Sequence, residues 1–281
     1  MGLVVLGEDD FNFLKKYIYS LLGIYMIPAK RILVQNRLQN RLKELRMRSF
    51  NEYCEYISST EGKDKETKHF INAITTNKTD FFRDPEQFDN LKDKILPEII
   101  EQSKKNEIVI WSAACATGEE PYSIAMTVKE LLTRDKHINK HIKIIASDIS
   151  TNALGIAQQG IYSVSKADSI SLAYQKKYLL RGQNDKMDLI KVTPEIRNMV
   201  EYFVLNLMED HFDDVCEADI IFCRNVFIYF QNAEIIKVID NMSKRLLTGG
   251  YIIFGSADTI MYSGSSLEKV TGCIYRKKYN K

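Results

Sequence analysis

A regular alternation of strand-like and helix-like stretches, running from residue 107 towards the end of the chain, is the feature that most constrains the fold. Each strand-like stretch is short and rich in β-branched residues, and helical patterns separate most of them. This alternation predicts an α/β domain with a mostly parallel sheet and helices on both faces. The predicted strands are "EIVIWS" (107–112), "HIKIIASD" (141–148), "ADIIFCRN" (218–225), "YIIFGS" (251–256) and "CIYRKK" (273–278).

Two of the crossover helices carry clear end signals. The stretch "STNALGIAQQG" offers Ser150 as an N-cap and Gly160 as a stop, and "NAEIIKVIDNMSKRLLTGG" offers Gly249 as a stop. Residues 161–200 interrupt the alternation and predict a small inserted subdomain of short antiparallel strands.

The chain before residue 105 is helical in pattern throughout. Its first helix, "DDFNFLKKYIYSLLG", places Phe13 and Tyr17 on an apolar stripe with Leu21 and Ile24. The helix "DPEQFDNLKDKILPEIIEQSKK" offers Asp84 as an N-cap ahead of Pro85, and Ser49 is the expected N-cap of an earlier one. We therefore predict an N-terminal helical domain (1–83), an α/β domain (84–281) and a subdomain inserted in it (161–200).

Composition excludes several classes of protein. The chain has 281 residues, 45% of them hydrophobic, and a net charge of +2, so it is globular and bulk charge indicates no partner. Its five cysteines include no CxxC pair, and its four histidines form no HExxH motif, so we expect no disulfide framework and no metal. The start lacks the basic region of a signal peptide and no apolar run could span a membrane, which predicts a cytoplasmic protein without membrane insertion.

The turn after the first predicted strand, "WSAACATGEEPYS" (111–123), is rich in small residues and lets a ligand approach the backbone. It has no GxGxxG motif, and Glu119 and Glu120 at the helix start would repel a pyrophosphate. A ligand with a cationic group is therefore favoured. The alternative is that the acids serve only the helix, with Thr117 and Glu120 forming a capping box.

Asp148 ends the second predicted strand, where nucleotide-binding α/β folds place an acid on ribose hydroxyls. It could equally cap the next helix. Combined with an acidic first turn and no phosphate loop, it favours a nucleoside with a positive charge and no phosphate. S-adenosylmethionine, with its sulfonium and α-ammonium, fits this description.

Two further clusters follow predicted strands. Asn206 and Leu207 come after a short apolar run and suit the edge and face of an adenine, although an Asn in a turn would look the same. Arg224 and Asn225 end a strand within "FCRNVFIYF", where a charge flanked by apolar residues needs a partner. For Arg224 a purely structural ion pair remains the alternative.

The stretch "INAITTNKTDFFRDPEQF" (71–88) joins the two halves. Together with "WSAACATGEEPYSIAM", "ASDIS", "GIYS", "NLM" and "CRNVFIYF", it resembles the chemotaxis protein methyltransferases (CheR) over nearly the whole chain. The resemblance implies a class I methyltransferase, Rossmann-like fold and the cofactor S-adenosylmethionine, with S-adenosylhomocysteine as product. It also implies cofactor contacts from Asn77, Thr79, Arg83, Glu119, Asp148, Asn206, Leu207, Arg224 and Asn225.

The resemblance further implies methyl transfer to glutamate side chains of chemoreceptors, whose cytoplasmic region would be the partner of a monomeric enzyme. A carboxylate is already ionised at neutral pH, so the reaction needs orientation and desolvation rather than a general base. Arg83, Arg224 and Tyr229 are the candidates for orienting the acceptor, and Phe81 and Phe82 are expected to anchor the joining stretch on the sheet domain.

A basic stretch, residues 30–48, is the candidate substrate surface. Its spacing predicts one face shared by Lys30, Arg37, Arg41 and Arg48, which suits an acidic helical partner, although it could be a solvated face. No aromatic stacking surface accompanies it, so we expect no nucleic-acid partner.

One stretch departs from the family pattern. "FGSADTI" (254–260) stands where relatives carry His, Ser and Glu after the glycine, with Ser256, Ala257 and Asp258 in their place. This departure supports a second hypothesis, a non-catalytic module that binds the cofactor as a sensor or scaffold. A third hypothesis, independent of this stretch, is a methyltransferase of the same fold acting on RNA or a small molecule.

Overall fold

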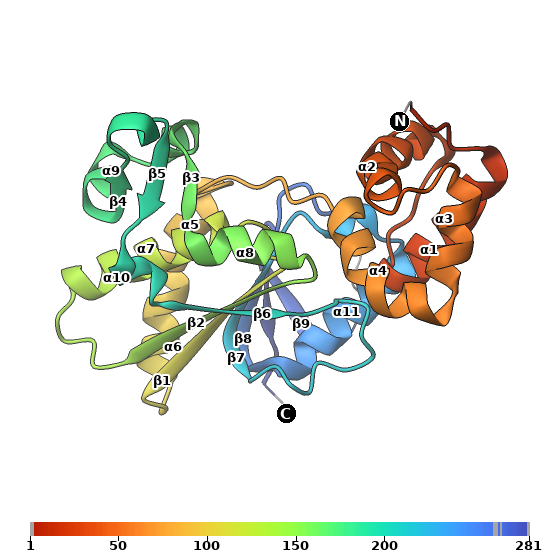
Figure 1. Cartoon of the computed structure of the whole chain (residues 1–281). Coiled ribbons are helices and arrows are strands. Elements are labelled where there is room, and N and C mark those ends of the chain that lie inside the picture. Colours follow the sequence, from red (N-terminus) through yellow and green to blue (C-terminus); the bar gives the residue numbers. More distant parts are fainter. Residues whose placement is uncertain (1–2, 261–263, 265, 280–281) are drawn as a thin grey trace.

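The computed structural model describes residues 3–260, 264 and 266–279. Figure 1 shows a helical domain at one side, a central twisted sheet, and a small subdomain projecting beyond the sheet at the other side. This arrangement confirms the predicted fold: an all-helical N-terminal part, a mostly parallel sheet and a small antiparallel insertion.

The central sheet has seven strands in the order β6-β2-β1-β7-β8-β10-β9. The first five run parallel to one another, and β10 and β9 form an antiparallel edge. The order reverses beside β1, so the carboxyl ends of β1, β2 and β7 meet at one edge, where α/β sheets bind ligands. The strands are β1 (Glu107–Ala113), β2 (His141–Asp148), β6 (Val200–Val204), β7 (Ala218–Cys223), β8 (Leu246–Phe254), β9 (Leu267–Thr271) and β10 (Ile274–Lys277).

Both faces of the sheet are covered, which explains why its strands read as continuous apolar runs. On one face, side chains of the helices before and after β1 form a core, and on the other a separate core surrounds Trp111 and helix α11. The covering helices are α5 (Pro85–Asn90), the π-helical turn η2 (Leu91–Ile95), α6 (Leu96–Gln102), α7 (Glu119–Arg134), α8 (Thr151–Gln159) and α11 (Asn232–Arg245).

Three details of the sheet differ from the sequence prediction. Strand β6 follows the inserted subdomain and pairs with β2, and β9 was not predicted. Helix α11 ends at Arg245 rather than at Gly249, because β8 already begins at Leu246. The glycines serve the strand instead: a Cβ on Gly250 would lie 2.6 Å from the Asp219 carbonyl oxygen. At α8, by contrast, Ser150 and Gly160 cap the two ends as predicted.

The helical domain encloses a core of its own. Its first helix buries Phe11, Leu14, Ile18 and Leu22 rather than the predicted stripe that begins at Phe13. Both series are apolar at helical spacing, so periodicity alone cannot choose between them. The domain comprises α1 (Glu8–Leu22), η1 (Pro28–Lys30), α2 (Arg31–Glu44), α3 (Phe50–Ser58) and α4 (Thr60–Ile74), and Ser49 caps α3 as predicted.

Residues 75–84, here called the linking segment, run without regular structure from α4 to α5. Phe81 is fully buried against Tyr162, and Phe82 packs on Phe88, which confirms the anchoring role predicted for the pair. Asp84 stands at the N-cap of α5, but its side chain makes no capping bond.

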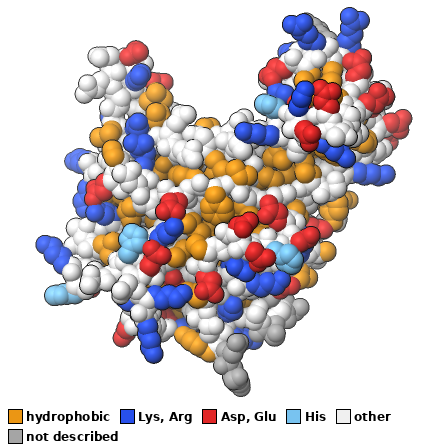
Figure 2. Space-filling model, turned by 60° about the horizontal axis from the view of Figure 1, so that its bottom comes forward, with side chains coloured by type: hydrophobic (Ala, Val, Ile, Leu, Met, Phe, Trp, Pro, Cys, Tyr) orange, Lys and Arg blue, Asp and Glu red, His pale blue; other side chains and the backbone are white. Residues whose placement is uncertain are grey.

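The inserted subdomain is a three-stranded antiparallel sheet in the order β3-β5-β4 with short helices around it. Figure 2 shows this subdomain and the helical domain as two projections separated by a notch. Its elements are β3 (Ile161–Ser163), η3 (Val164–Ser169), α9 (Leu172–Tyr178), β4 (Leu179–Arg181), η4 (Asn184–Lys186), β5 (Leu189–Val192) and α10 (Pro194–Arg197).

A buried ion pair stabilises the helical domain. Both oxygens of Glu66, which is 1% exposed, accept from Arg41, at 2.8 and 2.7 Å, and one also accepts from the Tyr53 hydroxyl at 3.0 Å. The Arg41 guanidinium therefore faces the interior of this domain.

We predict that Arg41→Ala lowers the free energy of unfolding by about 3 kcal/mol, because it leaves a buried carboxylate without its cation. Arg48→Ala, at an exposed position after α2, is the control and should leave stability nearly unchanged. Urea denaturation of both variants measures the difference, and equal stabilities would show that the Glu66 pair contributes nothing.

Candidate functional site

The turn between β1 and α7 forms the floor of the site. Ala114 and Ala116 adopt left-handed backbone conformations, with φ of 56° and 48°, and Gly118 follows with φ of 94°. A Cβ on Gly118 would lie 2.7 Å from the Cβ of Ala157, so only glycine fits against α8. This tight turn exposes backbone groups to a ligand at the carboxyl end of β1.

Asp148 ends β2 and is 7% exposed. One carboxylate oxygen accepts from the Ala116 amide and the other from the Ser150 amide, each at 2.8 Å. Burial raises the pKa of this carboxyl, and the backbone hydrogen bonds partly oppose the shift. Asp148 thus fixes the first turn and the start of α8 together, and it also lines the cavity above them.

A cavity lies between this edge of the sheet, the linking segment and the helical domain. Eleven of the sequence-predicted residues line it, and Glu119, Arg41 and Arg48 do not. Those that line it are Lys30, Arg37, Asn77, Thr79, Arg83, Asp148, Asn206, Leu207, Arg224, Asn225 and Tyr229.

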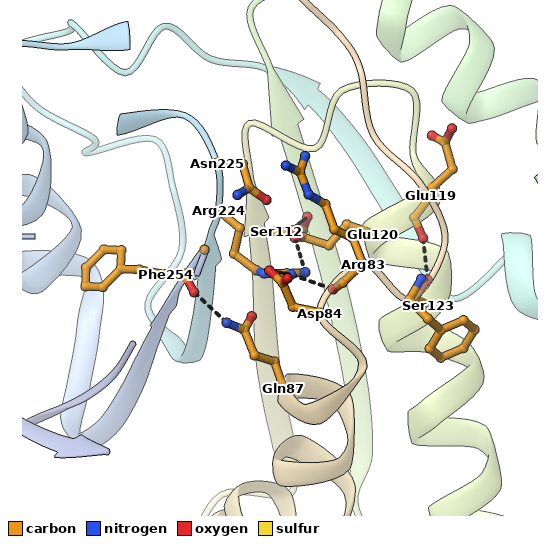
Figure 3. Close-up of polar contacts among 12 residues, drawn as sticks. Arg83, Asp84, Gln87, Ser112, Glu119, Glu120, Ser123, Arg224, Asn225 and Phe254 are labelled. Atoms are coloured by element: carbon orange, nitrogen blue, oxygen red, sulfur yellow. Dashed lines mark hydrogen bonds and ion pairs between the residues drawn. The ribbon is translucent and has the colours of Figure 1, made fainter. Parts of the chain in front are cut away.

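Arg224 is the centre of a buried polar network (Figure 3), with only 2% of its side chain exposed. Its guanidinium contacts Glu120 at 3.1 Å, Asp84 at 2.8 Å and the Arg83 carbonyl oxygen at 2.5 Å. The ring of Phe88 lies 5.4 Å from the guanidinium carbon. These contacts form the structural ion pair that the sequence left open as the alternative role of Arg224.

The pKa values of the two carboxyls in this network are shifted in opposite directions. Burial raises the pKa of Glu120, and the nearby Arg224 and the hydroxyl of Ser112, 2.7 Å away, only partly oppose it. For Asp84, burial would also raise the pKa, but hydrogen bonds from Arg224 and Ser256 outweigh it and lower the pKa overall.

Glu119 does not line the cavity, whereas its neighbour Glu120 does, and in Figure 3 the Glu119 carboxylate points away from Arg224. Its side chain is 1% exposed, accepts from Thr117 and pairs with Lys166 at 3.1 Å. Lys166 also contacts Asp80 and the Thr79 carbonyl, so this pair ties the inserted subdomain to the linking segment. The capping box of Thr117 and Glu120, which was the alternative to a ligand-binding turn, is absent, since Glu120 binds Ser112 and Arg224 instead.

The helical domain is held against the site by direct hydrogen bonds. The Asn206 amide donates to the Leu21 carbonyl at 2.8 Å, and the Tyr25 amide donates to the Tyr229 carbonyl at 3.0 Å. The Asn77 amide donates to Ser150 at 3.2 Å. These contacts close the cavity between the two domains.

The basic residues predicted to share a face are divided by the fold. Lys30 lies 5.7 Å from the centre of the Tyr229 ring, and Arg37 donates to the Ile74 carbonyl and to Thr76, so both reach the cavity. Arg41 turns inward to Glu66. Arg48 is exposed beyond the end of α2, so the single helical face that the spacing predicted does not form.

Within the described ranges, no cluster of His, Cys, Asp and Glu could hold a metal ion. Among those same residues, no helix is both long and apolar enough to cross a membrane.

Comparison with known families identifies this arrangement. Residues 9–75 match the model of the CheR methyltransferase all-alpha domain, and residues 77–275 match the CheR methyltransferase SAM binding domain. The chain belongs to the CheR methyltransferase family.

Curated relatives match over nearly their full length. The chain is 34% identical to a chemotaxis protein methyltransferase of Borreliella burgdorferi over 273 residues, covering 96% of this chain and 94% of the relative. Chemotaxis protein methyltransferase 2 of Pseudomonas aeruginosa is 34% identical over 95% of this chain and 92% of its own length. The Escherichia coli chemotaxis protein methyltransferase is 32% identical over 92% of this chain and 87% of its own length.

This CheR methyltransferase uses S-adenosylmethionine as cofactor, and the residues of the cavity fit that molecule. Two carboxylates, Asp148 and Glu120, suit its ribose and its cationic groups, and no Gly-rich phosphate loop is present. The buried Asn225 amide nitrogen has no partner within the described ranges, which leaves a donor for a ligand or water.

We predict that cofactor binding weakens as the pH falls through the acidic range, because burial raises the pKa of Glu120 and protonation removes its charge. Glu120→Gln should bind S-adenosylmethionine weakly throughout and lose much of this pH dependence. Glu119→Gln, one residue away and outside the cavity, is the matched control and should keep it. Calorimetric titration across this range decides, and a Glu120→Gln profile like that of the wild type would contradict the assignment.

Proposed function

We propose that this CheR methyltransferase is a protein-glutamate O-methyltransferase that forms methyl esters on the cytoplasmic region of chemoreceptors. The observation that carries the proposal is the mixed charge of the cavity lining: the cations Lys30, Arg37 and Arg83 line it together with the acids Asp148 and Glu120. The two acids suit the cationic cofactor, and the three cations suit an anionic acceptor. The relatives named chemotaxis protein methyltransferases support a receptor as that acceptor.

The cofactor supplies an activated methyl group, so the protein has to orient the acceptor carboxylate and remove water from it. A glutamate carboxylate, with a pKa of about 4.3, is already ionised at neutral pH and needs no general base. The guanidinium of Arg83 makes no hydrogen bond or ion pair with any described residue and extends into the cavity (Figure 3), so it is free to orient a carboxylate. Tyr229 lies on the same cavity and is the second candidate.

Arg224 has a different role in this proposal from the direct contact that its motif predicted. Its guanidinium already binds two carboxylates and a carbonyl, and its remaining Nε atom is buried. Arg224 therefore acts as a positioning residue that holds the segment carrying Arg83. Asn77, Thr79, Asn206 and Leu207 complete the proposed cofactor pocket.

The alternative of a non-catalytic cofactor-binding module rested on the altered "GSADTI" stretch. In the structure Asp258 does not line the cavity, and its carboxylate is bound by backbone amides. The altered stretch therefore puts no Asp258 side chain into the cavity, and this favours an enzyme over a non-catalytic module. We further propose that the protein acts as a cytoplasmic monomer.

The decisive assay is transfer of radiolabelled methyl from S-adenosylmethionine to a receptor cytoplasmic fragment, followed by alkali and counting of volatile methanol. Alkali-labile label on protein is expected, because a carboxyl methyl ester hydrolyses in base. Label that survives alkali would overturn the glutamate assignment. Cofactor binding without any transfer over a panel of receptors would favour the non-catalytic module.

We predict that Lys30→Gln raises KM for the receptor fragment several-fold, because it removes a cation from the lining of the cavity. Cofactor affinity should stay the same, since Lys30 contacts the Tyr229 ring rather than either of the acids Asp148 and Glu120. The matched control is Lys43→Gln, an exposed lysine of the same basic stretch that does not line the cavity. Equal KM values for the two variants would remove Lys30 from the acceptor site.

A further inference from the structure

The turn after β8, which contains Gly255 and Asp258, packs against the turn after β7 but does not line the cavity. Asp258 in this turn is 7% exposed. Its carboxylate accepts hydrogen bonds from three backbone N–H groups, those of Asn225 at 2.6 Å, Gly255 at 2.9 Å and Phe227 at 3.2 Å. Two of these donors belong to a different segment, the turn that leaves β7. The carboxylate thus fastens one loop of the sheet's edge to its neighbour.

The turn that Asp258 holds carries two cavity residues. Asn225 adopts a left-handed conformation with φ of 58°, which costs free energy for a residue with a side chain. Tyr229 follows within the short helix η5 (Phe227–Tyr229), whose first amide donates to Asp258. The left-handed conformation of Asn225 and the direction of η5 therefore both depend on the Asp258 carboxylate.

Gly255 supplies the space for this arrangement. A Cβ at Gly255 would lie 2.6 Å from the Asn225 side-chain nitrogen and 2.7 Å from its backbone nitrogen. Such distances do not occur for real Cβ atoms, so a larger residue would displace Asn225. Both residues thus act on Asn225: Gly255 leaves room for it, and Asp258 accepts a hydrogen bond from its backbone N–H.

We infer that Asp258 is a positioning residue for the cofactor site: with Gly255 it fixes the left-handed Asn225 and the η5 turn so that Asn225 and Tyr229 face the cavity. Neither Asp258 nor Gly255 lines the cavity, so their effect on binding passes through the turn. The inference concerns the cofactor site and does not depend on which molecule accepts the methyl group.

A carboxylate is required because all three donors are N–H groups. An Asn at this position would present one oxygen and one amide nitrogen, and the nitrogen would face at least one N–H donor without an acceptor. A Glu keeps both oxygens on a longer side chain. Asp258→Asn and Asp258→Glu therefore separate the loss of acceptors from a change in length.

The test uses the full chain and measures S-adenosylhomocysteine affinity by calorimetry alongside Tm. Asp258→Asn should weaken binding about tenfold or more, as expected for lost hydrogen bonds to a charged group. The matched control is Asp219→Asn, another buried aspartate, which accepts the Val109 amide at 2.9 Å near the amino end of β7. It should lower Tm but keep affinity within about twofold of wild type.

Two further variants complete the test. Asp258→Glu should recover part of the lost affinity, and Gly255→Ala should weaken binding although it leaves every acceptor in place. If Asp258→Asn does not fold, Gly255→Ala decides alone. Wild-type affinity in Gly255→Ala, or the same affinity in Asp258→Asn as in Asp219→Asn, would make this turn merely structural and overturn the inference.

Discussion

The buried guanidinium of Arg224 is the interaction on which the rest of the site depends. It joins a carboxylate of α7 to the linking segment, through Glu120 on one side and through Asp84 and the Arg83 carbonyl on the other. Removing charges from water is costly, and such a pair stabilises a fold only when its hydrogen bonds are nearly complete. The value of this network lies in its geometry, because it fixes where an irregular segment crosses the sheet.

The position of the linking segment determines the cavity. Phe81 and Phe82 anchor it by burial, Arg224 holds its end, and Lys166 of the inserted subdomain holds its middle. Asn77 and Arg83 are thereby placed over the carboxyl ends of the strands. The resulting cavity is lined by acids and cations together, and its acids Asp148 and Glu120 suit a cationic cofactor.

Local signals in the sequence predicted much of the fold. Strand β2 begins and ends where its pattern does, and Ser49, Ser150 and Gly160 cap helices as expected, because these features depend on residues close in the chain. The positions of the motifs after successive strands also predicted that most of the candidate site residues would lie together, since the strands of a parallel sheet end at one edge.

The features of the site that the sequence did not predict depend on contacts between residues far apart in the chain. Nothing local separates Glu119 from Glu120: one faces Lys166 and the other faces Arg224, and both partners are far away in the sequence. The inward turn of Arg41 depends on Glu66 in another helix. The role of Asp258 depends on amides of a turn about thirty residues away, so its replacement of a family residue could be noticed but not interpreted.

Hydrogen–deuterium exchange of residues 75–84, with and without S-adenosylhomocysteine, tests the central claim most directly. The variant Arg224→Lys keeps the charge but loses the planar fork that reaches both sides of the network. The control is Arg245→Lys, whose arginine pairs with the surface residue Asp213 at 3.0 Å. If Arg224 holds the linking segment, exchange there rises in Arg224→Lys alone and added S-adenosylhomocysteine protects it less. Wild-type exchange in that variant would contradict this account.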